Sequence, residues 1–284
     1  MKRILIIGAG SFIGRFFLDN SKGYDVMEFD IESSSYEQIC FDNIDVVFHV
    51  AAIVHQDKNI SDELYFSVNR DLAFNAAQAA KKAGVSHFIF MSTVKVYGEN
   101  STLDHPWNEL TACSPLDAYG KSKFEAEKLL SDLNDDHFIV SIIRTPLVYG
   151  SGVKGNVKKI ANLVKSFPII PLGRIDNTRS MVYVGNLIAL VKRVIDLQYV
   201  GVVLANDSRN VGTSDFVKFL IKGSGKKRLL LPFPSLLRWL IKRCKPELYR
   251  RLFGSLVVDS SITFDKINFD PPYAMSEGFK EVMK

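Results

Sequence analysis

The sequence has few cysteines and few histidines. Its 284 residues include three cysteines, Cys40, Cys113 and Cys244, which lie far apart and form no Cys-x-x-Cys pair. Its five histidines show no spacing typical of metal ligands. This pattern argues against a disulfide framework and against a structural zinc site, and it favours a reducing compartment. We therefore expect a cytoplasmic protein without a metal centre.

Long apolar runs are also missing. A membrane-spanning helix needs about 18 or more consecutive apolar residues, and the nearest candidate, LLLPFPSLLRWL at 229–240, is interrupted by Pro232 and Pro234. Lys2 and Arg3 before an apolar run imitate a secretory signal, but the glycine motif described below makes that run a first β-strand. We expect no stable membrane insertion.

Acidic residues are scarce in one segment. The net charge is only +5, yet residues 222–251 hold ten Lys or Arg residues against a single acid, Glu247. A solvated basic face, a site for anionic substrate groups and a contact with an acidic membrane surface all remain open. Nucleic acid is disfavoured as a partner, because no recognised binding motif accompanies the charge.

The sequence does contain a regular alternation of short apolar runs and longer helical patterns. The runs at 3–8, 24–30, 45–52, 87–93 and 138–145 predict buried strands. Residues 63–84 predict a helix that ends at Gly84. Such alternation predicts an α/β fold, a doubly wound parallel sheet with helices on both faces.

A glycine motif, GAGSFIG, follows the first predicted strand directly. Glycines let a pyrophosphate approach the backbone, and the N–H groups and dipole of a helix N-terminus favour negative charge. The motif at a strand end therefore predicts a dinucleotide site. Its candidate residues are Gly8, Gly10, Ser11, Phe12, Ile13 and Gly14, with Ala51 and Ala52 after the third strand.

Asp30 ends the second predicted strand, sixteen residues after Gly14. A carboxylate there accepts hydrogen bonds from both ribose hydroxyls and repels a 2′-phosphate, which favours NAD(H) and leaves NADP(H) as the alternative. Only about fourteen residues separate Asp30 from the next strand, so a strand and a helix are missing. Asp30 could therefore instead be a later acid that contacts adenine.

DAYGKSKFEAEKLL at 117–130 places Tyr119 and Lys123 one turn apart on one helix face. No other tyrosine has a lysine four residues later, and Thr93 closes a predicted strand 26 residues upstream of Tyr119. Hydride transfer at a carbon that bears oxygen requires a proton to move on that oxygen, and a phenol of pKa ~10 is a weak base. We expect Tyr119 as acid/base, Lys123 as the group that favours its phenolate and binds ribose, and Thr93 as the orienting group. The alternative is a surface pair without chemistry.

Six motifs in order, GAGSFIG, FHVAA, STVKVYG, YGKSK, RTPLVYGSG and NTRSMVYVGNL, resemble the extended short-chain dehydrogenase/reductase family, in its NAD-dependent epimerase/dehydratase branch. The family usually has Gly where Ser11 stands. The resemblance covers nearly the whole chain and implies a Rossmann-type domain at 1–150 and 178–210 and a substrate-binding lobe at 151–177 and 211–284. It implies an enzyme that acts on a UDP-sugar or another nucleotide-sugar in the synthesis of surface polysaccharide precursors.

Departures from the family patterns bear on the reaction. In the 4,6-dehydratases the catalytic Ser or Thr is followed by Asp and Glu, whereas Val94 and Lys95 follow Thr93 here, which disfavours dehydration. Many 4-epimerases have Asn at the position of Leu147. The remaining pattern resembles quinovosamine-type reductases. We therefore expect first a 4-reductase of a UDP-4-keto-6-deoxy-N-acetylhexosamine. The alternatives are a UDP-hexose or UDP-N-acetylhexosamine 4-epimerase and a non-catalytic dinucleotide-binding sensor.

The resemblance also nominates substrate contacts. Arg179 and Asn156 are implied at the diphosphate, where an arginine can bind in a bidentate manner, and Thr93 and Lys95 are further contacts. Arg251 is a candidate from the basic segment, with a solvated position as its alternative. His55 could touch the sugar, although a lone loop histidine is more often structural. A homodimer is left open.

Overall fold

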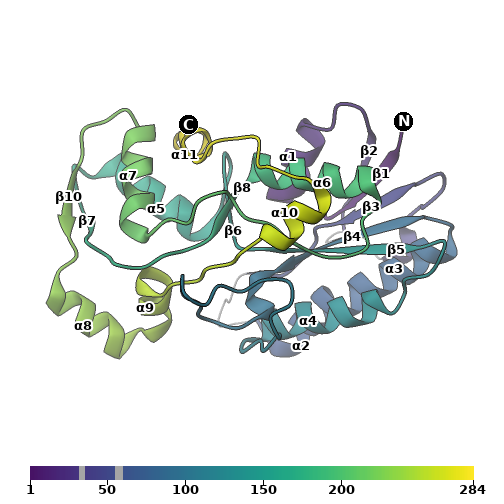
Figure 1. Cartoon of the computed structure of the whole chain (residues 1–284), viewed down its shortest axis with the longest axis horizontal. Helices are drawn as coiled ribbons and strands as arrows, with labels where there is room; N and C mark the ends of the chain where they lie inside the picture. The colour runs from purple at the N-terminus through teal and green to yellow at the C-terminus, as the bar shows by residue number, and fades with distance from the viewer. Residues whose placement is uncertain (32–35, 55–59) are drawn as a thin grey trace.

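A six-stranded parallel sheet forms the centre of the protein, whose computed structural model describes residues 1–31, 36–54 and 60–284. The strand order is β2-β1-β3-β4-β5-β9, and helices cover both faces (Figure 1). The predicted α/β fold of the Rossmann type, with its five early strands, is therefore confirmed. The strands are β1 (Arg3–Ile7), β2 (Asp25–Phe29), β3 (Val46–His49), β4 (His87–Thr93), β5 (Ile139–Thr145) and β9 (Gly201–Leu204).

The two faces of the sheet enter two separate apolar cores. In β1, Ile4 and Ile6 pack in one core with Phe17, whereas Leu5 packs in the other with Ala76. Because helices bury both faces, the strands are continuous apolar runs and not alternating ones. The first face is covered by α1 (Phe12–Asp19) and α6 (Val184–Leu197), and the second by α3 (Ala73–Lys82) and α4 (Ala118–Ser131).

β2 lies at one edge of the sheet. β1 pairs in parallel with β2 on one side and with β3 on the other. Between β2 and β3 the described residues contain only a short 3-10 turn, Tyr36–Gln38. The sequence predicted that a strand and a helix are absent between Asp30 and β3, and the described residues there contain neither. Among the described residues, no strand pairs with the outer side of β2.

The helix predicted over 63–84 is divided into three parts. α2 (Asp62–Phe66) continues into a π-helical segment, Ser67–Leu72, and then into α3. The C-terminal end agrees with the sequence, because Gly84 adopts φ +87° just after the last turn. The helix prediction for 63–84 assumed α-helical spacing throughout and therefore did not include this segment. π turns inside α-helices are frequent at functional sites.

Residues 155–173 and 213–253 build the end of the molecule away from the sheet (Figure 1), whereas β9 and α6, which also follow Gly150, belong to the sheet and to its first covered face. One apolar cluster nevertheless extends from Ile4 in β1 to Phe279 in the last helix, so the division at 1–150 and 178–210 against 151–177 and 211–284 stays a prediction. The elements are β6 (Leu147–Tyr149) paired with β8 (Met181–Tyr183), β7 (Ile169–Gly173) paired with β10 (Leu229–Pro232), and helices α5 (Gly155–Ser166), α7 (Thr213–Gly223), α8 (Ser235–Cys244), α9 (Pro246–Phe253), α10 (Ser261–Ile267) and α11 (Met275–Met283).

In the part of the chain that the structure describes, no helix combines the length and the apolar composition needed to cross a membrane. The same residues contain no group of three or more His, Cys, Asp or Glu side chains placed to hold a metal ion.

Candidate active site

The glycine motif forms a tight turn between β1 and α1. Gly8 has φ +113°, and a Cβ atom on it would lie 2.7 Å from the backbone nitrogen of Ala51, so only glycine fits this close approach. Ser11 caps α1, because its Oγ accepts a 3.2 Å hydrogen bond from the N–H of Gly14. Gly10 has φ +70° and open space where a Cβ would be. The turn thus presents bare backbone and a helix N-terminus at one place.

Asp30 lies beside this turn. The N–H groups of Gly8 and Ala9 donate hydrogen bonds of 3.0 and 3.1 Å to the carbonyl oxygen of Phe29, the residue before Asp30. The ends of β1, β2 and β3 therefore meet, and Asp30 is exposed at that edge. The structure brings together all the predicted cofactor contacts other than Lys123 at the carboxyl ends of three neighbouring strands: Gly8, Gly10, Ser11, Phe12, Ile13, Gly14, Asp30, Ala51 and Ala52.

Thr93 and Tyr119 lie close enough that the Thr93 side chain acts as a hydrogen-bond partner that lowers the pKa of the Tyr119 hydroxyl. Thr93 ends β4, and Tyr119 lies in the first turn of α4. Burial raises the pKa of Tyr119 to about 12, and the hydrogen bond from Thr93 opposes this only in part. Because burial dominates, the hydroxyl is protonated at neutral pH, and the expected role of Lys123 in favouring the phenolate stays a prediction.

Lys123 is buried against β4. Its Nζ donates a 2.8 Å hydrogen bond to the carbonyl oxygen of Met91 and lies 4.2 Å from the centre of the Phe90 ring. Burial lowers the pKa of Lys123 to about 7, and the nearby carboxylate of Glu127 acts in the opposite direction. The ammonium group is therefore positioned by the backbone of the strand that ends in Thr93.

The start of α4 packs unusually close to the chain after Thr93. A Cβ atom on Gly120 would lie 2.9 Å from the carbonyl oxygen of Lys95, which explains the glycine between Tyr119 and the lysine. Asp117 caps the helix, with Oδ1 accepting a 2.7 Å hydrogen bond from the N–H of Gly120. Its other carboxylate oxygen is bound by the ammonium of Lys95. Asp117 and Lys95 thus fix α4 against the end of β4.

Asn69 connects the π-helical segment to the candidate site. Its side chain is fully buried, accepts a 2.9 Å hydrogen bond from the N–H of Ile53, and donates 3.1 and 3.2 Å hydrogen bonds to Ile53 O and Ser122 Oγ. It therefore holds the loop after β3 against α4.

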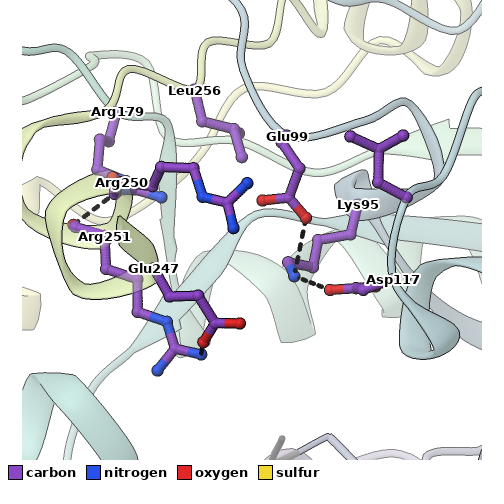
Figure 2. A pocket seen from close by; sticks show the side chains of 9 residues that line it. Lys95, Glu99, Asp117, Arg179, Glu247, Arg250, Arg251 and Leu256 are labelled. Carbon is purple, nitrogen blue, oxygen red and sulfur yellow. Dashed lines mark hydrogen bonds and ion pairs between the residues drawn. The ribbon is translucent and has the colours of Figure 1, made fainter. Parts of the chain in front are cut away.

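A cavity of about 280 Å³ lies between α9 and the segments that carry Lys95 and Asp117. Figure 2 shows Lys95 paired with Glu99 and Asp117 on one side of the cavity, and the arginines with Glu247 on the other. Lys95 and Asp117 each stand two residues from a candidate catalytic side chain, Thr93 and Tyr119 respectively. The lining consists of Lys95, Glu99, Leu116, Asp117, Arg179, Glu247, Arg250, Arg251 and Leu256.

A second cavity, of about 120 Å³, shares Arg179 and Arg251 with the first. It is also lined by Asn156, from the start of α5, and by Leu147. All four predicted substrate contacts other than Thr93 therefore lie around two adjoining cavities. Residues from four distant parts of the sequence meet here.

Arg179 also holds α9 in place. Its Nη1 donates hydrogen bonds of 2.8 Å to the carbonyl oxygen of Arg251 and 3.4 Å to that of Gly254. Burial lowers the pKa of Arg179, while Glu99 and Arg251 have smaller and mutually opposing effects. A guanidinium with this environment gains from an anion placed between it and Arg251.

A buried ion pair behind the site was not predicted. Arg144 Nη2 lies 2.6 Å from Glu127 Oε2, and Glu127 also accepts a hydrogen bond from Ser92, next to Thr93. Glu127 stands one turn after Lys123 on α4, and Arg144 lies in β5. The only sequence signal was charge in otherwise apolar segments. The pairing of Arg144 with Glu127 could not be assigned without knowing the strand order.

The comparison with known proteins agrees with this geometry. Residues 4–204 match the NAD dependent epimerase/dehydratase family. The chain belongs to this family. UDP-glucose 4-epimerase from Vibrio cholerae is 36% identical over 261 residues, which cover 89% of this chain and 80% of that protein.

Two further similarities extend over nearly the whole length of this family member. N-acetyl-alpha-D-glucosaminyl-diphospho-ditrans,octacis-undecaprenol 4-epimerase from Escherichia coli O157:H7 is 26% identical over 300 residues, 97% of this chain and 89% of that protein. The solved structure of a dTDP-4-dehydrorhamnose reductase from Clostridium acetobutylicum superposes with a TM-score of 0.81 at 23% identity, over 99% of this chain and 98% of that one. This last similarity shows the fold.

Membership of the epimerase/dehydratase family confirms the resemblance found in the sequence. This family member is an NAD(P)-dependent enzyme of nucleotide-sugar chemistry. The predicted site residues are placed as described above, except that His55, expected as a sugar contact, lies outside the described residues.

Proposed function

We propose that the protein transfers a hydride at C4 of a sugar carried on a diphosphate, with UDP-hexoses and UDP-N-acetylhexosamines as the substrate class. The observation that carries this proposal is a cavity whose lining combines Arg179, Arg250 and Arg251 with Lys95 and Asp117, which stand two residues from Thr93 and Tyr119 respectively. A proton donor and a site for a diphosphate lie next to each other. This is the pairing that C4 chemistry on a nucleotide-sugar requires.

The residues at the glycine turn fit a dinucleotide. The backbone around Gly10 is open, and Gly8 is packed too closely on Ala51 to carry a side chain. In the proposal, the pyrophosphate lies against Gly8–Gly14 and the α1 N-terminus, Asp30 binds the adenosine ribose, and Ala51 and Ala52 line the opposite wall. When bound, NAD accepts the hydride and NADH donates it.

The proton is moved by Tyr119. As C4 is reduced, the Tyr119 hydroxyl gives its proton to the C4 oxygen and becomes a phenolate, and in the oxidative direction the phenolate takes the proton back. A pKa of about 12 in the structure keeps the hydroxyl in its donor form. Thr93 bonds the same oxygen and orients it, and Lys123, fixed on Met91, binds the nicotinamide ribose and adds positive charge beside the phenol.

The diphosphate lies between the guanidinium groups of Arg179 and Arg251. Both line the two cavities, and Asn156 at the start of α5 lies on the far side of the second one. Arginine suits a diphosphate because its planar donors bind two oxygens at once. Lys95, held by Glu99 and Asp117, is a contact for the sugar hydroxyls and less suited to the diphosphate, because two carboxylates already neutralise it.

Two C4 reactions have distinct support. The Vibrio cholerae and Escherichia coli relatives are both 4-epimerases, and the similarity extends over most of this chain. Leu147, in the wall of the second cavity, occupies a position where many 4-epimerases carry Asn, which favours a 4-reductase of a UDP-4-keto-6-deoxy-N-acetylhexosamine. The epimerase must let a transient 4-keto sugar rotate between the two transfers, whereas the reductase uses one face once.

One assay separates these reactions. The enzyme is incubated with UDP-glucose, with UDP-N-acetylglucosamine, or with the 4-keto sugar plus NADH, while nicotinamide absorbance and the NMR spectrum of the sugar are followed. Interconversion of C4 epimers without net nicotinamide oxidation identifies the epimerase. Stoichiometric oxidation of NADH with a single C4 product identifies the reductase. Absence of turnover with all three would contradict C4 chemistry on UDP-sugars.

A further inference from the structure

The helix α8 exposes an apolar face to solvent. Leu236, Trp239 and Leu240 are 70%, 59% and 41% exposed, and none of the ten residues of α8 is buried. Together with Arg243 they stand at i, i+3, i+4 and i+7, which places them on one side of the helix. These four residues are called the α8 face below. Leucine and tryptophan side chains in contact with water at this density mark an interaction surface.

The opposite side of α8 is already occupied. Arg238 lies 4.8 Å from the centre of the Phe253 ring and donates a 3.4 Å hydrogen bond to Tyr249 Oη. Lys242, one turn later, stacks over the Tyr249 ring at 5.8 Å. These contacts attach α8 to α9, so the α8 face must point away from the protein. Figure 1 shows α8 at the end of the molecule, far from the central sheet.

The charge around the α8 face indicates what covers it. Residues 222–251 hold ten of the 36 Lys and Arg residues and one of the 31 Asp and Glu residues, which leaves 26 basic and 30 acidic residues in the rest of the chain. The protein is therefore acidic apart from this one basic segment. An apolar helix face with Trp, flanked by Lys and Arg, matches a bilayer with anionic headgroups.

We propose that the α8 face docks on the surface of a membrane that contains anionic phospholipids. Leu236, Trp239 and Leu240 enter the boundary between headgroups and acyl chains, while Arg243 and Lys245 remain at the phosphates. A helix of ten residues is too short to span a bilayer and lies on its surface. The protein binds reversibly and is not inserted.

This docking has a consequence for the cavities. Glu247, three residues after the end of α8, and Arg250 and Arg251 of α9 line the larger cavity. A docked α8 therefore brings the proposed diphosphate site close to the headgroup layer. Sugars that are attached through a diphosphate to a membrane lipid would reach the site from there. The docking itself does not depend on which reaction the site performs.

The test measures binding of the full-length protein to vesicles without any sugar substrate. We expect sedimentation with vesicles of phosphatidylcholine and phosphatidylglycerol, little sedimentation with phosphatidylcholine alone, and weaker binding as salt is added. The double variant Leu236→Glu/Leu240→Glu should lower the partition coefficient by about tenfold or more. The matched control Leu197→Glu/Val200→Glu changes two exposed apolar residues at the opposite end of the molecule, and it should bind like the wild type.

Trp239 provides a second measurement. The chain has two tryptophans, and Trp107 packs on Tyr97 at a ring distance of 5.5 Å. Anionic vesicles should shift the emission to shorter wavelength in the wild type, and Trp239→Phe should remove the shift. Circular dichroism and turnover of a soluble UDP-sugar verify that the variants are folded, and they report on the proposed reaction separately.

Two outcomes would overturn the proposal. The first is that the wild type does not bind anionic vesicles. In that case, a change of oligomeric state caused by Leu236→Glu/Leu240→Glu in size-exclusion chromatography would assign the α8 face to a second copy of this chain. The second is that both double variants bind vesicles as the wild type does.

Discussion

Lys123 donates a 2.8 Å hydrogen bond from Nζ to the carbonyl oxygen of Met91, two residues before Thr93 in β4. The hydrogen bond connects the lysine of the Tyr-x-x-x-Lys motif to β4, the strand that ends in Thr93. It also buries an amine, since Lys123 is 1% exposed. The ammonium group therefore serves the site at a cost in stability, and that cost depends on pH.

The variant Lys123→Met should reveal this cost. The pKa of Lys123 is lowered from 10.5 to about 7 by burial. Between these values the unfolded chain binds a proton that the folded chain does not, so wild-type stability rises with pH in that window. Lys123→Met should raise Tm by ~3 °C or more below about pH 7, and the gain should shrink toward pH 10. Exposed Lys121→Met is the control, and a pH-independent gain for Lys123→Met would contradict the assignment. Turnover should be lost at every pH.

The variant Tyr119→Phe should lower kcat by ~10²-fold or more, because the proton donor is removed. Cofactor binding and Tm should change little, since the ring remains. Tyr24→Phe is the matched control: it removes a hydroxyl that donates a 2.8 Å hydrogen bond to Asp196, away from the site. Steady-state kinetics with both variants decides the matter, and unchanged turnover in Tyr119→Phe would remove Tyr119 from the mechanism.

Cofactor choice should depend on Asp30. If its carboxylate binds the adenosine ribose, NADH should bind more tightly than NADPH, and Asp30→Ala should narrow the difference by about tenfold, since a 2′-phosphate is no longer repelled. Fluorescence titration with both nucleotides measures this ratio. Asp25→Ala, at the other end of β2 where Asp25 pairs with Arg3 at 3.0 Å, should leave the ratio unchanged. Equal affinities in the wild type would show that Asp30 does not face the 2′ position.

The buried pair Arg144–Glu127 should dominate the stability of the region behind the site. Glu127→Gln leaves the guanidinium of Arg144 without its carboxylate, and we expect a loss of about 3 kcal/mol in the free energy of unfolding. Adding Arg144→Met should recover much of this loss. Asp215→Asn, which breaks the exposed pair with Lys218, should cost less than ~1 kcal/mol. Urea denaturation measures all of these, and similar losses for Glu127→Gln and Asp215→Asn would refute the prediction.

The central strands could be predicted because each is a local apolar run, and the glycine turn because Gly8 and Gly10 follow such a run. The π-helical segment at Ser67–Leu72 was not predicted, because the helix prediction for 63–84 assumed α-helical spacing throughout. The dominance of burial in the pKa of Tyr119 was not predicted either. The motif places Lys123 one turn away, but the degree of desolvation depends on packing by residues distant in sequence.

By itself the sequence determined the α/β class, the order of strands and helices, the glycine turn and the Thr93, Tyr119 and Lys123 motif, because these depend on short-range spacing along one strand or helix. Only the tertiary structure decided that Arg179 and Arg251 border the same two cavities, that Lys95 is held by two carboxylates, and that the α8 face points outward. Each of these depends on contacts between elements far apart in the chain. Such contacts follow from how helices and loops pack around the sheet, which local periodicity does not specify.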